Sequence, residues 1–489
     1  MYDVLVRVFV YTRVKNTQVN YIAVHVFYYV HVYRIVDGVL TGIVHLDEPR
    51  RQTRTRRRAM STPSRTRIAP DGVVTYVGRN RSSCGYCAEE EASTSGFNTK
   101  RKSETSVSDG AVAHRLSARA YNDLCDDGWR RSGSWVYKPA IGVTCCAQHT
   151  IRLDVGRFKA SKSQRKVERR LRAYSARRED GENETQEGDG DRDGDDGNAR
   201  TFTIETARST FIEEEYELWK RYQAAVHGDA PSELRRESYA RFLVESPIVA
   251  EPPRSDTPSV GYGAFHQQYR MDGRLIAVGV VDILPRCLSS KYFFWDPDYA
   301  HLSLGKLSAL EEIKFVQKES LRSPEFRYYY MGYYIHTCPK MKYKAEYSPS
   351  EIRCSTTNRW VLVDDPETQR RLNAREDVRL SADSVLERRV CEPARSLVGL
   401  MMNGELVTVT TLSELASLAQ STLRVSAENW RAFSEKQAEF CQRVGPVGES
   451  MMNVIDIERD LLFPRSMDSS SDDEDEDDEE EEEIDDDES

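Results

Sequence analysis

The chain has few cysteines for its length, and it has no uninterrupted apolar run long enough to cross a membrane. Ten cysteines in 489 residues are too few for a disulfide scaffold. This low content favours a reducing compartment, which is the cytoplasm or both the cytoplasm and the nucleus. A membrane-spanning helix needs about 20 mostly apolar residues. The β-branched and aromatic stretch from Tyr21 to Val36 is interrupted by His25, His31 and Arg34. We therefore expect no membrane partner.

Basic residues are absent from residues 468–489, so the net charge of the whole chain does not describe the charge of the other residues. The formal net charge is −11, but this segment holds 17 carboxylates, so the rest of the chain carries +6. A second acidic run, residues 179–196, has ten carboxylates against Arg192. Neither run has the apolar residues that a core needs, and both are predicted to be disordered. The predicted folded part is mildly basic and suits anionic partners.

Setting these runs aside leaves two segments that are long enough for a core each. Residues 1–70 are predicted to be an atypical extension, either disordered or an artefact of the gene model, because Met60 opens a polar segment typical of an ordinary amino terminus. The remaining predicted parts are a cysteine-rich N-terminal domain over 71–178, an acidic disordered insert over 179–200, a mixed α/β domain over 201–362, a C-terminal helical region over 363–466 and an acidic disordered tail over 467–489.

Four of the ten cysteines form two close pairs in the first of these domains. Cys84 and Cys87 form a CxxC motif, and Cys145 and Cys146 are adjacent in the sequence about 60 residues later. Four thiolates from a tight turn and a distant pair can close a tetrahedral sulfur site, which suits zinc or an iron–sulfur cluster. Composition does not choose between the two. The alternative is two unrelated pairs of ordinary thiols.

Basic residues are interleaved with aromatic residues between and after these pairs. Residues 129–139 contain three aromatic and three basic residues, and residues 157–178 hold ten Lys or Arg residues against Glu168. Aromatic faces beside guanidinium groups bind single-stranded or tRNA ends, and a basic helix neutralises phosphates. The alternatives are a hairpin whose tryptophans are core residues and a solvated linker. The predicted tRNA-binding residues are Arg130, Arg131, Lys159, Lys162, Arg165 and Lys166.

Long and uncommon motifs occur in both halves of the chain. The first half contains the two cysteine pairs, Gly128-Trp129-Arg130-Arg131-Ser132-Gly133 and Tyr137-Lys138-Pro139; the second contains residues 211–223, 261–269, 275–285 and 330–344. Together these motifs resemble the eukaryotic arginyl-tRNA:protein transferases over 71–178 and 201–362. The family's usual Trp-Ala-His is Val112-Ala113-His114 here, so a role for that tryptophan does not carry over.

The resemblance implies an arginyltransferase that moves arginine from Arg-tRNA to the α-amine of proteins beginning with Asp, Glu or oxidised Cys. These proteins are then degraded through the ubiquitin-dependent N-degron pathway and the proteasome. The expected partners are Arg-tRNA and such proteins, and we expect a monomer that uses no acetyl-CoA. The alternatives are an acetyl-CoA-dependent N-acetyltransferase and a non-catalytic, metal-stabilised tRNA-binding protein.

The second half also predicts a fold. Its pattern indicates antiparallel strands over 260–269, 275–283 and 291–295, a hairpin turn over 271–274, a helix over 302–321 and a strand over 327–335. This order favours an α+β fold with a GNAT-like mixed sheet, which the family resemblance also implies. The opening of the helix has one glycine, where an acetyl-CoA pyrophosphate loop needs several free backbone donors. This feature disfavours acetyl-CoA.

An aminoacyl ester is already activated, so the attacking amine mainly needs to be neutral and held in line. Asp282, near a strand end, is predicted to take the proton of the amine or to bind the arginyl guanidinium, with a turn-capping carboxylate as the alternative. His266 and Gln267 are further catalytic candidates, and strand alternation lets only one of them face a given cleft. The predicted substrate-binding residues, in or beside a cationic segment, are Tyr330, His336, Lys340, Lys342 and Lys344.

Overall fold

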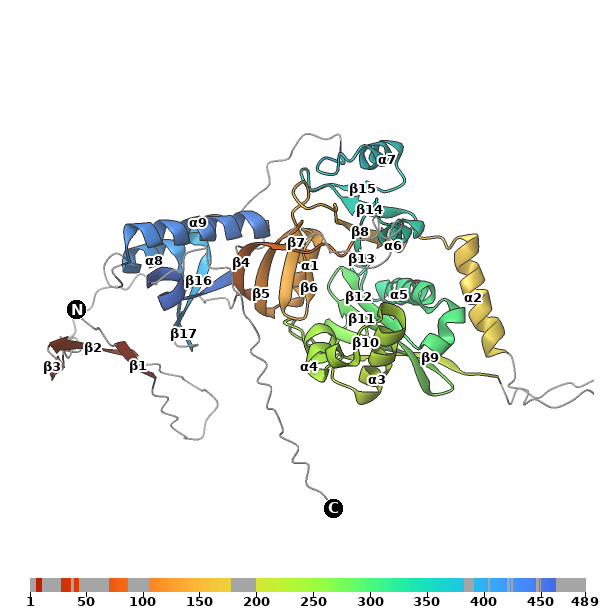
Figure 1. The fold of residues 1–489 in the computed structure, drawn as a ribbon, viewed down its shortest axis with the longest axis horizontal. Coiled ribbons are helices and arrows are strands. Elements are labelled where there is room, and N and C mark those ends of the chain that lie inside the picture. Colours follow the sequence, from red (N-terminus) through yellow and green to blue (C-terminus); the bar gives the residue numbers. More distant parts are fainter. Residues whose placement is uncertain are drawn as a thin grey trace, which may run out of the picture. The chain divides into compact units, whose positions relative to one another are not determined.

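The structure is a computed structural model that describes residues 6–10, 28–36, 39–43, 70–86, 105–176, 199–381, 391–402, 405–419, 423, 425–445, 448 and 450–462. Both acidic runs and Cys87 lie outside these residues, so the predictions for them are not addressed. The chain divides into two compact units, Met1–Arg67 and Ile68–Ser489. In the first unit, β1 (Val6–Val10), β2 (Tyr28–Val36) and β3 (Val39–Ile43) form a three-stranded antiparallel sheet (Figure 1).

The second unit contains a seven-stranded sheet that joins both ends of its sequence. The strand order is β17-β16-β18-β4-β5-β7-β6. The serine before helix α1 (Ala118–Asp126) caps it, since the Ser117 side chain accepts a hydrogen bond from the Ala120 N–H. The strands are β4 (Gly72–Ser82), β5 (Ser106–Leu116), β6 (Arg130–Ser132), β7 (Trp135–Pro139), β16 (Leu397–Met402), β17 (Glu405–Thr411) and β18 (Met451–Asp456).

The other sheet of this unit has eight strands in the order β15-β14-β8-β13-β12-β11-β10-β9. All neighbours are antiparallel except β12 and β13, which are parallel. The strands are β8 (His149–Asp154), β9 (Phe202–Arg208), β10 (Gly263–Met271), β11 (Arg274–Ile283), β12 (Cys287–Trp295), β13 (Tyr328–Tyr334), β14 (Ser350–Arg353) and β15 (Trp360–Leu362).

The predicted strands, helix and turn of the second half are confirmed. The turn between β10 and β11 is a two-residue hairpin in which Asp272 and Gly273 both have positive φ, as a tight hairpin requires. The predicted helix is α5 (Leu304–Ser320), which packs against β12 and β13. Helix α3 (Glu213–Tyr222) packs against β11 and β12 and belongs to a separate apolar cluster. The described residues therefore form a mixed α+β fold with two large sheets.

The region predicted to be helical, 363–466, contains helices α7 (Pro366–Asn373), α8 (Leu412–Leu418) and α9 (Ala427–Val444) together with strands β16, β17 and β18. Short apolar runs such as Met451–Asp456 do not distinguish a buried strand from a helix by periodicity. Here backbone pairing decides, because β18 pairs in parallel with β16 on one side and with β4 on the other. The Asn453 amide adds to this contact, since its oxygen accepts from the Tyr76 N–H at 2.9 Å and its nitrogen donates to Gln437 at 2.8 Å.

Three further α-helices lie in the part of the chain that the structure describes. Helix α2 (Lys162–Ser175) begins with a capping box at Ser161 and Gln164, whereas α4 (Arg236–Tyr239) and α6 (Pro339–Lys342) are single turns. Among the described residues, no helix has both the length and the apolar character that a membrane span requires.

Candidate functional site

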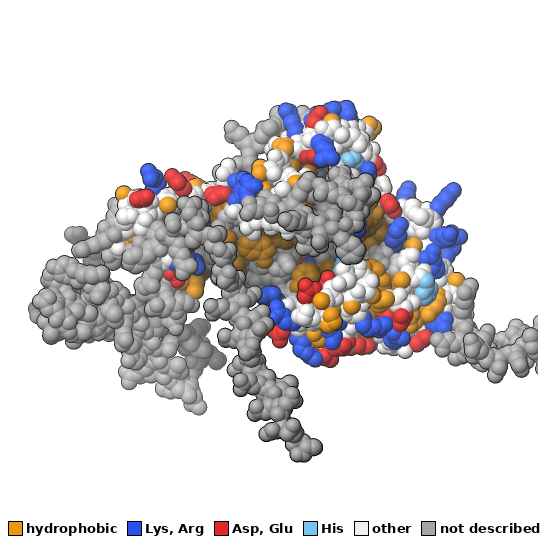
Figure 2. All heavy atoms as spheres, viewed as in Figure 1, with side chains coloured by type: hydrophobic (Ala, Val, Ile, Leu, Met, Phe, Trp, Pro, Cys, Tyr) orange, Lys and Arg blue, Asp and Glu red, His pale blue; other side chains and the backbone are white. Residues whose placement is uncertain are grey.

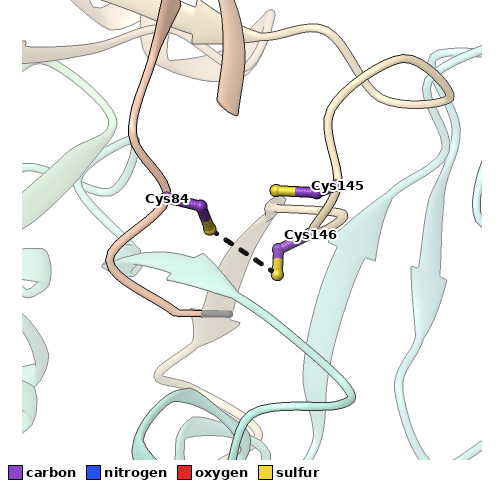
Figure 3. Close-up of side chains that lie close together, drawn as sticks. All are labelled: Cys84, Cys145 and Cys146. Carbon is purple, nitrogen blue, oxygen red and sulfur yellow. Dashed lines mark hydrogen bonds between the residues drawn. The ribbon is translucent and has the colours of Figure 1, made fainter. Parts of the chain in front are cut away.

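Three of the four predicted metal-binding cysteines lie together. The sulfur atoms of Cys84, Cys145 and Cys146 all lie within 4.8 Å of one another (Figure 3). Cys84 follows β4 and is buried, while the other two occupy the turn between β7 and β8, where Cys145 is exposed. Sγ of Cys84 lies 3.8 Å from Sγ of Cys146. Zinc–sulfur bonds of about 2.3 Å in a tetrahedral site place two sulfurs about 3.8 Å apart, so the cluster fits a soft metal whose identity it does not fix.

Asp282, predicted to be catalytic, forms a buried ion pair with Arg131, which was predicted to bind tRNA. The carboxylate accepts two hydrogen bonds from the guanidinium, at 2.8 and 2.5 Å, and both side chains are 1% exposed. Arg131 also donates to the carbonyls of Gly133 and Glu245, each at 3.1 Å. This pair joins β6 to β11, so it links the two large sheets and leaves neither group facing solvent.

His266 is the centre of a second buried network. Its Nδ1 lies 2.5 Å from Glu215, and its Nε2 lies 3.2 Å from both the Ser209 hydroxyl and the Leu243 carbonyl. The other oxygen of Glu215 accepts from the Gln268 amide at 2.8 Å. The network therefore fixes β10 against α3, which carries Glu215.

Gln267 lies on the opposite face of β10, as strand alternation predicts. Its amide nitrogen lies 3.3 Å from the Thr206 hydroxyl. It lines a cavity of about 210 Å³ together with Lys314 and Phe315 of α5. Among the catalytic candidates, Gln267 thus has a side chain that lines a cavity in the described part of the chain.

The predicted substrate-binding residues do not form one cluster. His336 is buried between the Tyr334 hydroxyl at 2.7 Å and Asn373 at 2.9 Å, and Tyr330 donates to Asp126. Lys344 donates to the Tyr333 carbonyl at 2.7 Å, and burial lowers the pKa of its amine to about 7. The remaining two, Lys340 and Lys342, are exposed on α6.

The predicted tRNA-binding residues separate into two buried and four exposed side chains. Arg130 is 5% exposed, donates to the carbonyls of Cys125 and Trp129, and lies over the ring of Tyr333. Trp129 is itself buried, so the alternative of core tryptophans describes this residue. The exposed residues lie on or just before α2, where Lys and Arg side chains gather (Figure 2); they are Lys159, Lys162, Arg165 and Lys166.

Glu312, which the sequence did not single out, is buried beneath the eight-stranded sheet. It is 1% exposed, and neither oxygen has a hydrogen-bond partner among the described residues. Burial raises the pKa of this carboxyl to about 7, while the nearby hydroxyls of Tyr329 and Ser290 oppose the shift. Its sequence signal was weak, because a single Glu on the apolar side of a helix is easily assigned to the surface.

Comparison with known proteins finds two family matches along the chain. The family described as "Arginine-tRNA-protein transferase, N terminus" matches residues 82–166, and "Arginine-tRNA-protein transferase, C terminus" matches residues 214–354. An "Arginyl-tRNA--protein transferase 1" of Arabidopsis thaliana is 58% identical over 164 residues, which are 33% of this chain and 26% of that protein.

Two longer matches cover most of the length of the matched protein in each case. "Arginyl-tRNA--protein transferase 1" of Drosophila melanogaster is 30% identical over 418 residues, 60% of this chain and 82% of that protein. An "Aspartate/glutamate leucyltransferase" of Pseudomonas putida is 30% identical over 285 residues, 58% of this chain and 93% of that protein. These matches define an aminoacyltransferase. Within that class, the chain belongs to the arginine-tRNA-protein transferase family.

Proposed function

We propose that this chain transfers arginine from Arg-tRNA to the α-amine of proteins that begin with Asp, Glu or oxidised Cys, which marks them for ubiquitin-dependent degradation. The observation that carries the proposal is the match to the Drosophila relative, which covers 82% of that protein at 30% identity. A leucyltransferase is also among the relatives, so leucine is the second donor to test.

The domain that holds β10 to β13 is proposed to be GNAT-like. Three antiparallel strands precede α5, and the strand that follows, β13, pairs in parallel with β12. This parallel pairing involves only the first three residues of each strand, Cys287–Ser289 and Tyr328–Tyr330. Strands that separate after a short parallel contact provide an opening for an acyl group, which supports the proposal.

In the reaction, the α-amine attacks the ester carbonyl, the amide bond forms, the bond to the tRNA ribose oxygen breaks, and the proton of the amine passes to that oxygen. We propose that Gln267 contacts substrate, because it lines a cavity. Lys344, with a pKa of about 7, is proposed to relay the proton in its neutral form. Asp282 and His266 are proposed to act as positioning residues through their buried partners.

The remaining partners are proposed on chemical grounds. Exposed cations of α2 support contact with tRNA phosphates, which predicts salt-sensitive binding. The cysteine cluster supports zinc or an iron–sulfur cluster, with Cys87 as the fourth ligand. Ten cysteines in 489 residues are too few for a disulfide scaffold, which supports the cytoplasm, and we propose a monomer there.

Transfer of labelled amino acids from charged tRNA to peptides beginning with Asp, Glu or Ala tests the function. We expect arginine, and not leucine, to label the first two peptides only. Equal labelling of all three peptides, or labelling of none, would contradict the proposal. Transfer from acetyl-CoA without tRNA would favour the N-acetyltransferase alternative, and tRNA binding without transfer would favour the non-catalytic one.

A further inference from the structure

A cavity of about 560 Å³ lies where three parts of the chain meet, and the described residues that line it include none of the predicted catalytic, substrate-binding, tRNA-binding or metal-binding residues. Its walls come from β4, β5 and β7 of the seven-stranded sheet, from β8 and the end of β14 in the eight-stranded sheet, and from α9. Helix α9 lies beyond both family matches. Four of the lining residues are cationic, namely Arg79, Lys138, Arg353 and Arg443.

Two carboxylates hold these four cations at the cavity. Asp109 lies 3.1 Å from Arg79 and 3.5 Å from Arg443, while Asp127 lies 2.8 Å from Lys138 and 2.7 Å from Arg353. Each carboxylate is shared by two cations, and Arg443 also lies 3.6 Å from Glu439. The charged side chains that line the cavity are therefore four cations and one carboxylate, Asp109. The Arg353 side chain is 6% exposed, so an anion beside it would meet little screening by water.

Gly128 lines the cavity, and its φ of +96° favours glycine. A Cβ atom there would lie 3.5 Å from Nη1 of Arg353, 3.7 Å from Oγ1 of Thr150 and 3.8 Å from Cε of Lys138. Thr150 is 3% exposed, and its hydroxyl has no hydrogen-bond partner in the described part of the chain. Buried hydroxyls normally have a partner, so this one indicates a ligand that accepts a hydrogen bond.

The other residues that line the cavity favour a peptide ligand over a nucleotide. Single-stranded nucleic acid stacks its bases on aromatic rings, and the described residues that line this cavity include none. They instead form an apolar wall beside the cations, made of Pro139, Ala140, Ile141 and Val143. The volume lies within the range of about 300–1,000 Å³ that is typical of sites for small ligands. An acidic residue at the start of a peptide matches this combination.

We infer that this cavity binds the acidic side chain at the amino terminus of the acceptor protein. The inference rests on the proposed arginyl transfer, for which it names the residues that recognise the acceptor. The carboxylate of Asp or Glu, or the sulfur-bound oxygens of oxidised Cys, would accept hydrogen bonds from Arg353 and Thr150. The guanidinium of Arg443 also lines the cavity, so a helix outside the family matches contributes to acceptor recognition.

Calorimetric binding of amidated dipeptides to the full chain, without tRNA, tests the inference separately from catalysis. Asp-Ala and Glu-Ala amides are expected to bind at least tenfold more tightly than Asn-Ala amide. Thr150→Val and Arg443→Gln should each weaken Asp-Ala binding about 10- to 100-fold, the range for hydrogen bonds to charged groups. Arg395→Gln is the matched control, because its side chain is 84% exposed and, within the described part of the chain, pairs with an exposed neighbour, Glu392.

Transfer kinetics give the second measurement. The same variants should raise KM for an Asp-peptide by the same factor and leave KM for Arg-tRNA unchanged. A raised KM for Arg-tRNA with unchanged dipeptide binding would assign the cavity to tRNA and overturn the inference. Inorganic phosphate that competes as well as the dipeptide would overturn it too, by showing a general anion site. Wild-type protein that transfers no arginine contradicts the proposed function, whatever the dipeptides show.

Discussion

Replacing Asp282 with Asn separates a structural role of this carboxylate from a catalytic one. The substitution keeps the shape of the side chain and removes its charge, so the buried guanidinium of Arg131 loses its counter-ion. Breaking a fully buried ion pair from one side costs about 3–5 kcal/mol of the free energy of unfolding, because the remaining charge is buried without compensation. General acid–base catalysis, by comparison, contributes about 10²- to 10⁴-fold to a rate.

The assay therefore combines urea unfolding with transfer rates measured under conditions where the variant is folded. We expect a loss of about 3–5 kcal/mol in stability and a small change in kcat for Asp282→Asn. The double variant Arg131→Met with Asp282→Leu should recover most of the stability, since well-packed apolar residues often replace a buried pair. An Asp282→Asn variant with wild-type stability and a kcat reduced at least 100-fold would refute the reasoning.

Three further predictions use other buried groups. Glu312→Gln should raise the free energy of unfolding by about 3 kcal/mol at pH 8 and by little at pH 4. The reason is that a folded-state pKa of about 7 makes the wild-type protein lose stability as the pH rises from about 4 to 7. Equal effects at both pH values in urea titrations would contradict this prediction. The sulfurs of Cys391 and Cys441 lie 3.0 Å apart, so oxidised glutathione should join them in a disulfide, which mass spectrometry detects as the loss of two hydrogens. Closing a loop of about 50 residues should stabilise the protein by about 4 kcal/mol. A Cys441→Ser variant is the control, and an unchanged mass of the wild-type protein would count against the pairing. Cys146→Ser should lose bound metal in anaerobic elemental analysis while the lone buried Cys354→Ser does not, and equal metal in both would remove the cluster as the site.

Local patterns in the sequence were sufficient to predict the strands, the turn and the helix that depend on neighbouring residues. The aromatic and β-branched runs of β10 to β13, the glycine turn after Asp272 and the helix α5 were all predicted correctly, because a period of two or 3.6 residues is visible within ten residues. The clustering of Cys84 with Cys145 and Cys146 was also predictable, because thiol pairs are rare enough for their spacing to be informative.

Contacts between distant segments could not be predicted in this way. Asp282 pairs with a residue 151 positions earlier, and nothing near it in the sequence indicates that partner. The cationic cavity is assembled from residues as far apart as Arg79 and Arg443, each unremarkable in its own segment. The position of β18 beside β4 could not be predicted either, because the local periodicity of a strand does not indicate which distant strand pairs with it in parallel.

That place of β18 bears on how the protein is synthesised. β18 lies between β16 and β4, and β4 is the first strand of the second unit, so this edge of β4 can be paired only after about 370 further residues have been made. At about 5–20 residues per second, a growing chain would present the unpaired edge for roughly 20–75 s. Unpaired strand edges recruit other chains. A ribosome that stops before Met451 would therefore release an N-terminal sheet with an open edge, which makes late truncation an aggregation hazard for the earliest part of this unit.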